Sequence, residues 1–285
     1  MTPLKLDSGA HIGAPLHAAG QTIIVGAEPR VGPGIDDIVG ADLRVGPEIT
    51  FMAKPEKLLQ ELNRMVNDQF ATPEFRHFLT LPLNRDRARF FVTQSAHYVK
   101  NRRDCWGYVQ GAAPLDVKAI IWKHEEDELV NDPRCNSDHY TLTVKTGESL
   151  GLKREEIDGS QPFPAGRAAF YAWLHLAKDR PWIEAFAASA ILERRNNGKI
   201  VQGGSLSDRV GKKWVAELGF KWDEMPDMKI HRDADEAHSD LMGMIFDRYV
   251  KSAADEDAAL RGARESLEID RAFRGALADA MAKIS

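Results

Sequence analysis

The sequence has little cysteine, no long apolar run and no excess of positive charge. Its 285 residues include only Cys105 and Cys135, which exclude a disulfide framework and favour a reducing, cytoplasmic setting. The net charge of -5 indicates no basic surface for nucleic acid or anionic lipid. No segment approaches the roughly 20 apolar residues of a membrane span, and no basic start precedes an apolar block. We therefore expect a cytoplasmic protein without nucleic-acid or membrane partners.

Residues 1–54 differ in composition from the rest of the chain. They are rich in glycine and proline and contain the sequence Arg-Val-Gly-Pro twice, beginning at Arg30 and at Arg44. No Lys-Ser or Lys-Thr pair follows these repeats, so they do not match a phosphate-binding loop. We expect a non-helical N-terminal extension over residues 1–54. It is either an ordered arm, packed on the domain or on a partner subunit, or a loosely held segment.

Almost nothing after residue 54 has the pattern of a β-strand, and apolar residues recur at helical spacing instead. The pattern predicts one helical domain over residues 55–285, an all-α bundle of seven or more helices with a C-terminal helical tail. In that tail, residues 255–284, a regular charge pattern favours a solvated helix or helix pair. The expected helices before it cover residues 55–65, 84–101, 114–130, 164–178, 181–195, 207–218 and 231–250, and one more begins near 138 and ends between 147 and 151.

A short run near the C-terminal third of the sequence carries the clearest chemistry. His231, Asp235 and His238 lie at positions i, i+4 and i+7, which places them on one face of a helix. Two imidazoles and one carboxylate on one stripe are typical of half a site for a first-row transition metal. The alternative is an exposed polar face, but apolar residues follow directly in the same helix. The pattern therefore favours a metal site.

Other helices offer further ligands for such a site. Glu125 and Glu128 are three residues apart and share a face of one helix, while His139 begins the next helix. Glu193 ends an apolar run, where a carboxylate must be paired, protonated or bound to metal. Pairing with Arg194 or Arg195 is the alternative for Glu193.

These motifs resemble the haem-oxygenase-like diiron oxidases and oxygenases, which share the fold of thiaminase-type proteins and pyrroloquinoline quinone synthase. The resemblance spans residues 55–250. Three signatures carry it: Asp127-Glu128-Leu129 followed by His139 ahead of Gly151-Leu152, Glu193 on an apolar helix, and His231-x3-Asp235-x2-His238.

The resemblance implies two Fe(II) ions with O2 as cosubstrate. The resemblance implies six ligands, three imidazoles and three carboxylates: Glu128, His139, Glu193, His231, Asp235 and His238. It also implies catalytic roles for the carboxylates Glu128, Glu193 and Asp235. Some family members add a glutamate from the preceding helix, but residues 97–104 contain none. This departure leaves open whether His97, Asp104, water or nothing fills that position. Glu125 is a second candidate for the first ligand.

The resemblance implies oxygen insertion at nitrogen, desaturation or C–C cleavage, in specialised biosynthesis. We expect a small amine or amino-acid-derived substrate, because no long aliphatic stripe indicates an acyl tunnel. A carboxylate-bearing substrate needs a nearby cation. Candidates are Lys100, Arg102, Arg194 and Arg195, each of which is also typical of a surface residue. A homodimer and an external electron donor are the expected partners.

Four other functions are conceivable on the same scaffold. A cofactor-independent oxidase resembling pyrroloquinoline quinone synthase needs no full ligand set, and a non-catalytic bundle binds metal without consuming O2. A thiaminase-like hydrolase needs a cysteine on the apolar helix, which reads Ala188-Ser189-Ala190 instead. Haem binding would need an axial histidine, for which only His77 and His97 are available on the early helices. The six-ligand pattern favours the diiron interpretation.

Overall fold

Helices account for nearly all of the chain that this computed structural model describes, residues 54–285, with side chains described at 56–232 and 242–285. The described part contains no β-strand and only an isolated bridge between Asp132 and Ser137. The predicted extension over residues 1–54 lies outside this part except for Lys54. The helices are α1 (Lys54–Phe70), α2 (Pro73–Thr80), α3 (Arg85–Ala112), α4 (Leu115–Leu129), α5 (His139–Ser149), α6 (Arg154–Asp158), α7 (Pro164–Asp179), α8 (Trp182–Arg194), α9 (Leu206–Leu218), the 3-10 turn η1 (Trp222–Glu224), α10 (Pro226–Tyr249) and α11 (Ala253–Ala282).

Local sequence signals fix where several helices begin and end. The side chains of Asn84, Asp138 and Ser205 accept hydrogen bonds from backbone N–H groups in the first turns of α3, α5 and α9. Such caps satisfy donors that have no partner within the helix. Gly219 ends α9 with a φ of 73°, a conformation that glycine adopts without steric cost. These caps also set the helix start at which His139 lies.

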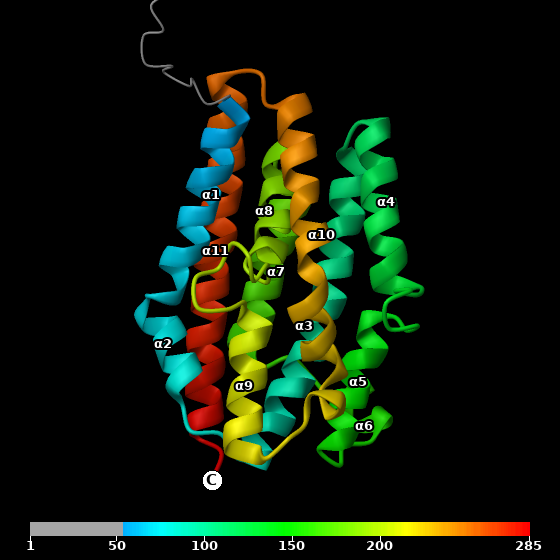
Figure 1. Cartoon of the computed structure of the whole chain (residues 1–285), viewed down its shortest axis with the longest axis vertical. Helices are drawn as coiled ribbons and strands as arrows, with labels where there is room; N and C mark the ends of the chain where they lie inside the picture. Colours follow the sequence, from blue (N-terminus) through cyan, green and yellow to red (C-terminus); the bar gives the residue numbers. More distant parts are fainter. Residues whose placement is uncertain (1–53) are drawn as a thin grey trace, which may run out of the picture. The chain divides into compact units, whose positions relative to one another are not determined.

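The apolar helix α8 forms the centre of the bundle. Every residue from Ile183 to Arg194 is buried, and α8 packs against α7, α10 and α11 (Figure 1). A helix that is apolar on all sides is stable only when other elements surround it. A Cβ added at Gly262 of α11 would lie 2.1 Å from the carbonyl oxygen of Glu184, so glycine permits the close approach of α11 to α8. Glu193 therefore sits near the middle of the bundle.

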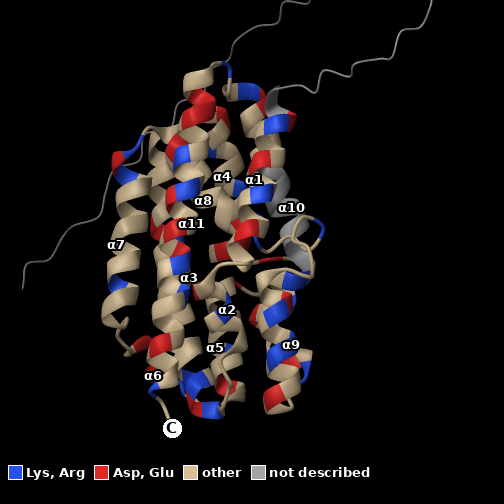
Figure 2. Ribbon diagram, turned by 90° about the vertical axis from the view of Figure 1, so that its left-hand side faces the viewer, with Lys and Arg blue, Asp and Glu red and all other residues tan. Residues whose placement is uncertain are grey.

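The structure confirms the all-α prediction and changes several boundaries. Helix α3 continues to Ala112 instead of ending near residue 101, and the short helices α2 and α6 were not predicted. The tail is one 30-residue helix, α11. Acidic and basic residues alternate along α9 and α11 (Figure 2), yet Asp270 and Arg274 of α11 are buried. The prediction of a solvated tail was therefore wrong for that face. No described helix is both long and apolar enough to cross a membrane.

Candidate metal centre

The loop between α4 and α5 folds back on itself and positions His139. Asp132 pairs with Ser137 across the loop, and its carboxylate accepts hydrogen bonds from the backbone and side chain of Arg134. The Asp138 cap then starts α5, so that His139 is the first residue of that helix. Asp132 and His139 are both fully buried. A local turn thus delivers an imidazole to the interior of the bundle.

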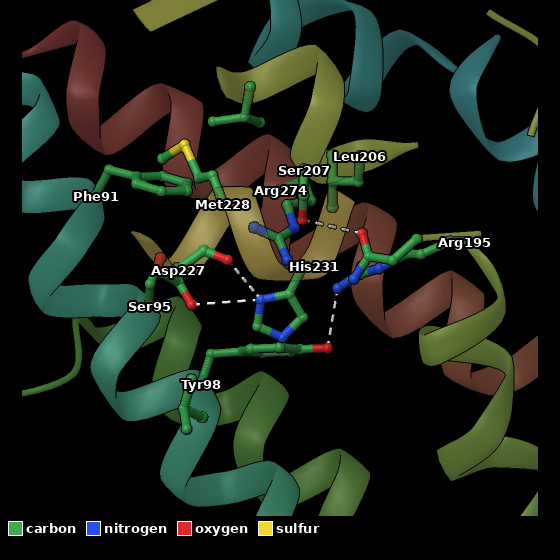
Figure 3. A pocket seen from close by; sticks show the side chains of 13 residues that line it. Phe91, Ser95, Tyr98, Arg195, Leu206, Ser207, Asp227, Met228, His231 and Arg274 are labelled. Atoms are coloured by element: carbon green, nitrogen blue, oxygen red, sulfur yellow. Dashed lines mark hydrogen bonds and ion pairs between the residues drawn. The ribbon is translucent and has the colours of Figure 1, made fainter. Parts of the chain in front are cut away.

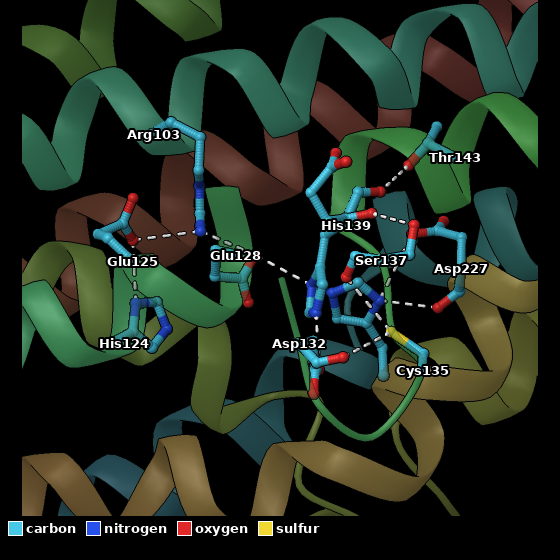
Figure 4. A network of polar contacts seen from close by, with 12 residues as sticks. Arg103, His124, Glu125, Glu128, Asp132, Cys135, Ser137, His139, Thr143 and Asp227 are labelled. Carbon is cyan, nitrogen blue, oxygen red and sulfur yellow. Dashed lines mark hydrogen bonds and ion pairs between the residues drawn. The ribbon is translucent and has the colours of Figure 1, made fainter. Parts of the chain in front are cut away.

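His139 lies between two carboxylates (Figure 4). Its Nδ1 is 3.0 Å from Oε2 of Glu128, and its Nε2 is 3.1 Å from Oδ2 of Asp132. Burial by itself lowers the pKa of His139, but the two carboxylates outweigh it and raise the pKa to about 9. Both ring nitrogens therefore carry protons at neutral pH when no metal is bound.

His231 of α10 brings a second imidazole to the same place. Its ring lies edge-on to that of His139, with 4.8 Å between the centroids. Its Nδ1 lies 2.8 Å from the backbone oxygen of Asp227, a group that only accepts, so Nδ1 donates and Nε2 is the ring nitrogen left for a metal. One ligand atom each from Glu128, His139 and His231 lies within 4.8 Å of the others. This cluster combines three of the six predicted ligands from three helices.

The donor set fits a transition metal. Two imidazoles and a carboxylate with room for further ligands are the combination typical of non-haem Fe(II). A histidine that binds metal commonly donates its other N–H to a carboxylate or a carbonyl. Asp132 provides that partner for His139, and the carbonyl of Asp227 provides it for His231.

Arg103 of α3, with 11% of its side chain exposed, is a cation within an acidic cluster formed by Glu125, Glu128 and Glu193. Its Nη1 lies 2.7 Å from Oε2 of Glu128 and 3.1 Å from Oε1 of Glu125, and Glu125 also pairs with Nδ1 of His124 at 2.9 Å. Burial raises the pKa of Glu128, but Arg103 and His139 hold it well below its usual range. Glu128 is therefore a carboxylate at neutral pH.

Glu193 adds a third acidic group from α8. It is 9% exposed, and burial together with the charge of Glu128 raises its pKa. His124, Arg103 and Arg102 outweigh these influences, so the net pKa of Glu193 is lowered. The charges of Glu128 and Arg103 influence Glu193, but Glu193 is not among the three residues whose ligand atoms lie within 4.8 Å of one another.

The structure describes the side chains of some remaining ligand candidates and not of others. Positions 235 and 238 belong to α10, four and seven residues after His231, but the side chains of Asp235 and His238 lie outside the described side chains. His97 instead lies 2.9 Å from Oγ of Ser160, and Asp104 is exposed. Glu125 is the alternative that reaches the cluster, through Arg103.

Two residues of this network were not predicted. On the sequence alone, Asn131-Asp132-Pro133 only signals the end of a helix, and Arg103 lies beyond the expected end of its own helix at residue 101. Asp132 lies directly before a proline and seven residues before the predicted ligand His139. This position indicates that Asp132 supports His139 only when the loop between them is known to fold back on itself. Nothing in the local sequence distinguishes Arg103 from the exposed cations around it.

A pocket opens beside His231. Its volume is about 90 Å³, and Tyr98, Arg195, Asp227 and Arg274 line it together with His231 (Figure 3). Of the four predicted cation candidates, Arg195 is the one that lines this pocket. Lys100 lies over the ring of Tyr140, Arg102 donates to the backbone oxygen of Ser189, and Arg194 donates to Asn63. The pocket joins the candidate metal centre to a cationic wall.

A family of known proteins matches most of this chain. The sequence profile of a family described as iron-containing redox enzymes matches residues 89–271, well over half of the chain. The chain belongs to this family. The match includes Glu128, His139, Glu193, His231, Asp235 and His238. No curated protein matches the sequence significantly.

Solved structures with low sequence identity share the fold. A domain of unknown function with a haem-oxygenase-like fold from Shewanella denitrificans OS217 has a TM-score of 0.63 at 17% identity, covering 81% of this chain and 92% of that one. A TenA homologue from P. horikoshii OT3 has a TM-score of 0.59 at 15% identity, covering 79% and 97%. A CADD-like protein of unknown function from Nostoc punctiforme PCC 73102 has a TM-score of 0.57 at 15% identity, covering 80% and 95%. The fold is therefore haem-oxygenase-like, as predicted.

Proposed function

We propose that this chain is an O2-dependent non-haem diiron oxidase or oxygenase acting on a small amine or amino-acid-derived substrate. The observation that supports it best is the convergence of Glu128, His139 and His231 from three helices on one buried point. The family's description as iron-containing redox enzymes points to the metal. The proposed ligands are the six predicted from the sequence: Glu128, His139, Glu193, His231, Asp235 and His238.

Bound Fe(II) supplies the electrons that reduce O2 at such a site. The protein residues have separate tasks. Asp132 and the carbonyl of Asp227 orient the two imidazoles, and the buried surroundings of Glu128 and Glu193 exclude bulk water from their carboxylates. His139 would hold a metal through Nδ1, the nitrogen that faces Glu128, and would have to release the proton on that nitrogen. Arg103 stabilises the carboxylates while the site holds no metal.

The small pocket supports the choice of substrate size. Its volume of about 90 Å³ is room for several water molecules, at about 10–15 Å³ of such space for each. A small amine or amino acid matches this space better than a long acyl chain. Oxygen insertion, desaturation and C–C cleavage all remain within the proposal.

Iron content and O2 uptake after anaerobic Fe(II) loading test the proposal directly. We expect about two irons per chain and O2 uptake that an amine or amino acid stimulates, as two-metal sites of this ligand type require. His139→Ala and His238→Ala should lose both properties. His175→Ala, which removes an exposed imidazole paired with Asp179, is the matched control and should retain both.

Two results would contradict the proposal in different ways. Iron binding without O2 uptake, with any amine or amino acid and with an added electron donor, would indicate a non-catalytic metal-binding bundle. No iron binding, with O2 uptake unchanged by His139→Ala, would indicate a cofactor-independent oxidase.

A further inference from the structure

A second buried charge cluster lies on the other side of the pocket from the acidic cluster. Arg195 of the α8 C-terminus and Arg274 of α11 both pair with Asp270. All three residues are at most 5% exposed. The other described polar partners are neutral at physiological pH, since Gln69 donates its amide to Asp270 and Tyr98 accepts from Nη2 of Arg195. Two guanidinium groups therefore share one carboxylate.

The positive charges of Arg195 and Arg274 are only partly compensated, as the contacts of individual atoms show. Nε of Arg195 is buried and has no hydrogen-bond partner in the described part of the chain. Nε of Arg274 binds Asp270, and the Arg274 guanidinium lies over the rings of Tyr98 and Phe273, 5.4 and 5.1 Å from their centroids. A buried cation without a full set of anionic partners costs free energy, which a bound anion would recover. The field of Glu193 also reaches Arg195, but Glu193 is a proposed metal ligand.

This surplus of positive charge faces the pocket beside His231. Arg195, Arg274 and the ring of Tyr98 line the same space as His231 (Figure 3). Guanidinium groups match the two oxygens of a carboxylate geometrically and bind it through charge-assisted hydrogen bonds. An anion held here would place its remaining atoms toward His231 and the candidate metal centre.

We propose that Arg195 and Arg274 anchor the carboxylate of a small substrate, an amino acid or a short carboxylic acid, in the pocket beside His231. The small volume excludes a polymer or a long acyl chain from this space. The proposal deepens the proposed function by naming the charged group that the substrate carries. That the bound carboxylate belongs to a substrate rests on the proposed function, but the binding itself needs no metal.

Calorimetric titration of the metal-free full-length protein tests the anchor. The probes are propionate, L-alanine, propionamide, n-propylamine and inorganic phosphate. We expect propionate and L-alanine to bind, and the neutral propionamide and cationic n-propylamine to bind at least about tenfold more weakly, because charge-assisted hydrogen bonds are lost. Equal binding of propionate and propionamide would overturn the proposal, and so would binding of phosphate in preference to both carboxylates.

Variants assign the binding to the arginines. Arg274→Gln should weaken propionate binding by about tenfold or more, and Arg274→Lys should restore part of it. The matched control is Arg85→Gln, which removes an exposed arginine lying over the ring of Phe220 and should leave binding unchanged. Unchanged propionate affinity in folded Arg274→Gln would also overturn the proposal. If that variant fails to fold, the selectivity of the wild type among the probes decides.

The two proposals can fail separately. Carboxylate binding without iron-dependent O2 uptake would contradict only the proposed oxidase function. Iron-dependent O2 uptake without carboxylate selectivity would contradict only the anchor.

Discussion

The bundle contains two buried charge clusters that differ in the sign of their surplus charge. In the acidic cluster, the carboxylates of Glu125, Glu128 and Glu193 outnumber the cations Arg103 and protonated His139. Nη1 of Arg103 pairs with Glu125 and Glu128, and the charge of Glu193 also reaches it. In the arginine cluster, Arg195 and Arg274 share the single carboxylate of Asp270. A buried surplus of charge favours a ligand of the opposite sign. One cluster is thus suited to a metal cation and the other to an anionic substrate, on either side of His231.

The largest expected effect is on the arginine cluster. Asp270→Asn would leave two buried guanidinium groups without their carboxylate and should lower the free energy of unfolding by about 3–5 kcal/mol. Urea denaturation measures the loss. Asp279→Asn, which removes an exposed carboxylate paired with His77, is the control and should change stability little. A loss below about 1 kcal/mol in Asp270→Asn would show that the cluster does not depend on this charge.

The second effect is a pH dependence of the acidic cluster. The folded pKa of His139 is about 9, above the unfolded value of 6.5. The protonated imidazole therefore contributes stability that is complete below pH 6.5 and is lost as pH rises through 9. Metal-free protein should lose up to roughly 3 kcal/mol across this window. Urea denaturation at several pH values measures it, and His139→Gln should remove most of the slope.

A flat pH profile in the wild type would contradict the arrangement of His139 between two carboxylates. Fe(II) binding should show the opposite trend, because the metal competes with a proton and binds more tightly as pH rises.

The sequence predicted the elements of the acidic cluster better than its connections. Periodicity predicted a helix over residues 231–250, and α10 does contain His231 but begins earlier, at Pro226. Glu128 and His139, which lie on either side of a helix stop in the sequence, are 3.0 Å apart in the structure, between Oε2 and Nδ1, and their role as metal ligands stays a prediction. Both predictions depend on local rules, namely the helical repeat and the Asp138 cap.

The parts that were missed depend on contacts distant in the sequence. Arg103 of α3 pairs with Glu128 of α4. Arg274 of α11 and Arg195, which follows α8, line the same pocket although they are far apart in the sequence. The charge pattern of α11 favours a solvated face because periodicity does not report that one charged turn lies against α8. Burial of a charge depends on packing between helices, which a single sequence does not specify.

The third effect concerns Arg103, whose positive charge replaces part of the metal's charge in the metal-free protein. Arg103→Met would remove a partner of Glu128 at 2.7 Å and of Glu125 at 3.1 Å. We expect a loss of about 2 kcal/mol in the metal-free protein, less than for Asp270→Asn, because His139 and His124 remain as partners. Anaerobic Fe(II) should restore the stability, since a cation then replaces the guanidinium.

Urea denaturation with and without Fe(II) separates this outcome from ordinary destabilisation. Arg248→Met, at an exposed arginine paired with Asp116, is the control. A loss in Arg103→Met that Fe(II) leaves unchanged would show that Arg103 has only a packing role.

The smallest expected effect on stability is at Glu193, where influences of opposite direction act on the carboxylate. Burial and the charge of Glu128 disfavour its charged form, while His124, Arg103 and Arg102 favour it and lower its pKa. Glu193→Gln should therefore lower the stability of the metal-free protein by no more than about 1 kcal/mol. The same change should abolish most of the stabilisation that Fe(II) provides, because a neutral amide is a poor ligand for iron. Small loss without metal and large loss with it would separate a metal ligand from a structural ion pair such as Asp270. Equal losses in both conditions would assign Glu193 to the framework of the bundle, and the acidic cluster would then need a different third carboxylate.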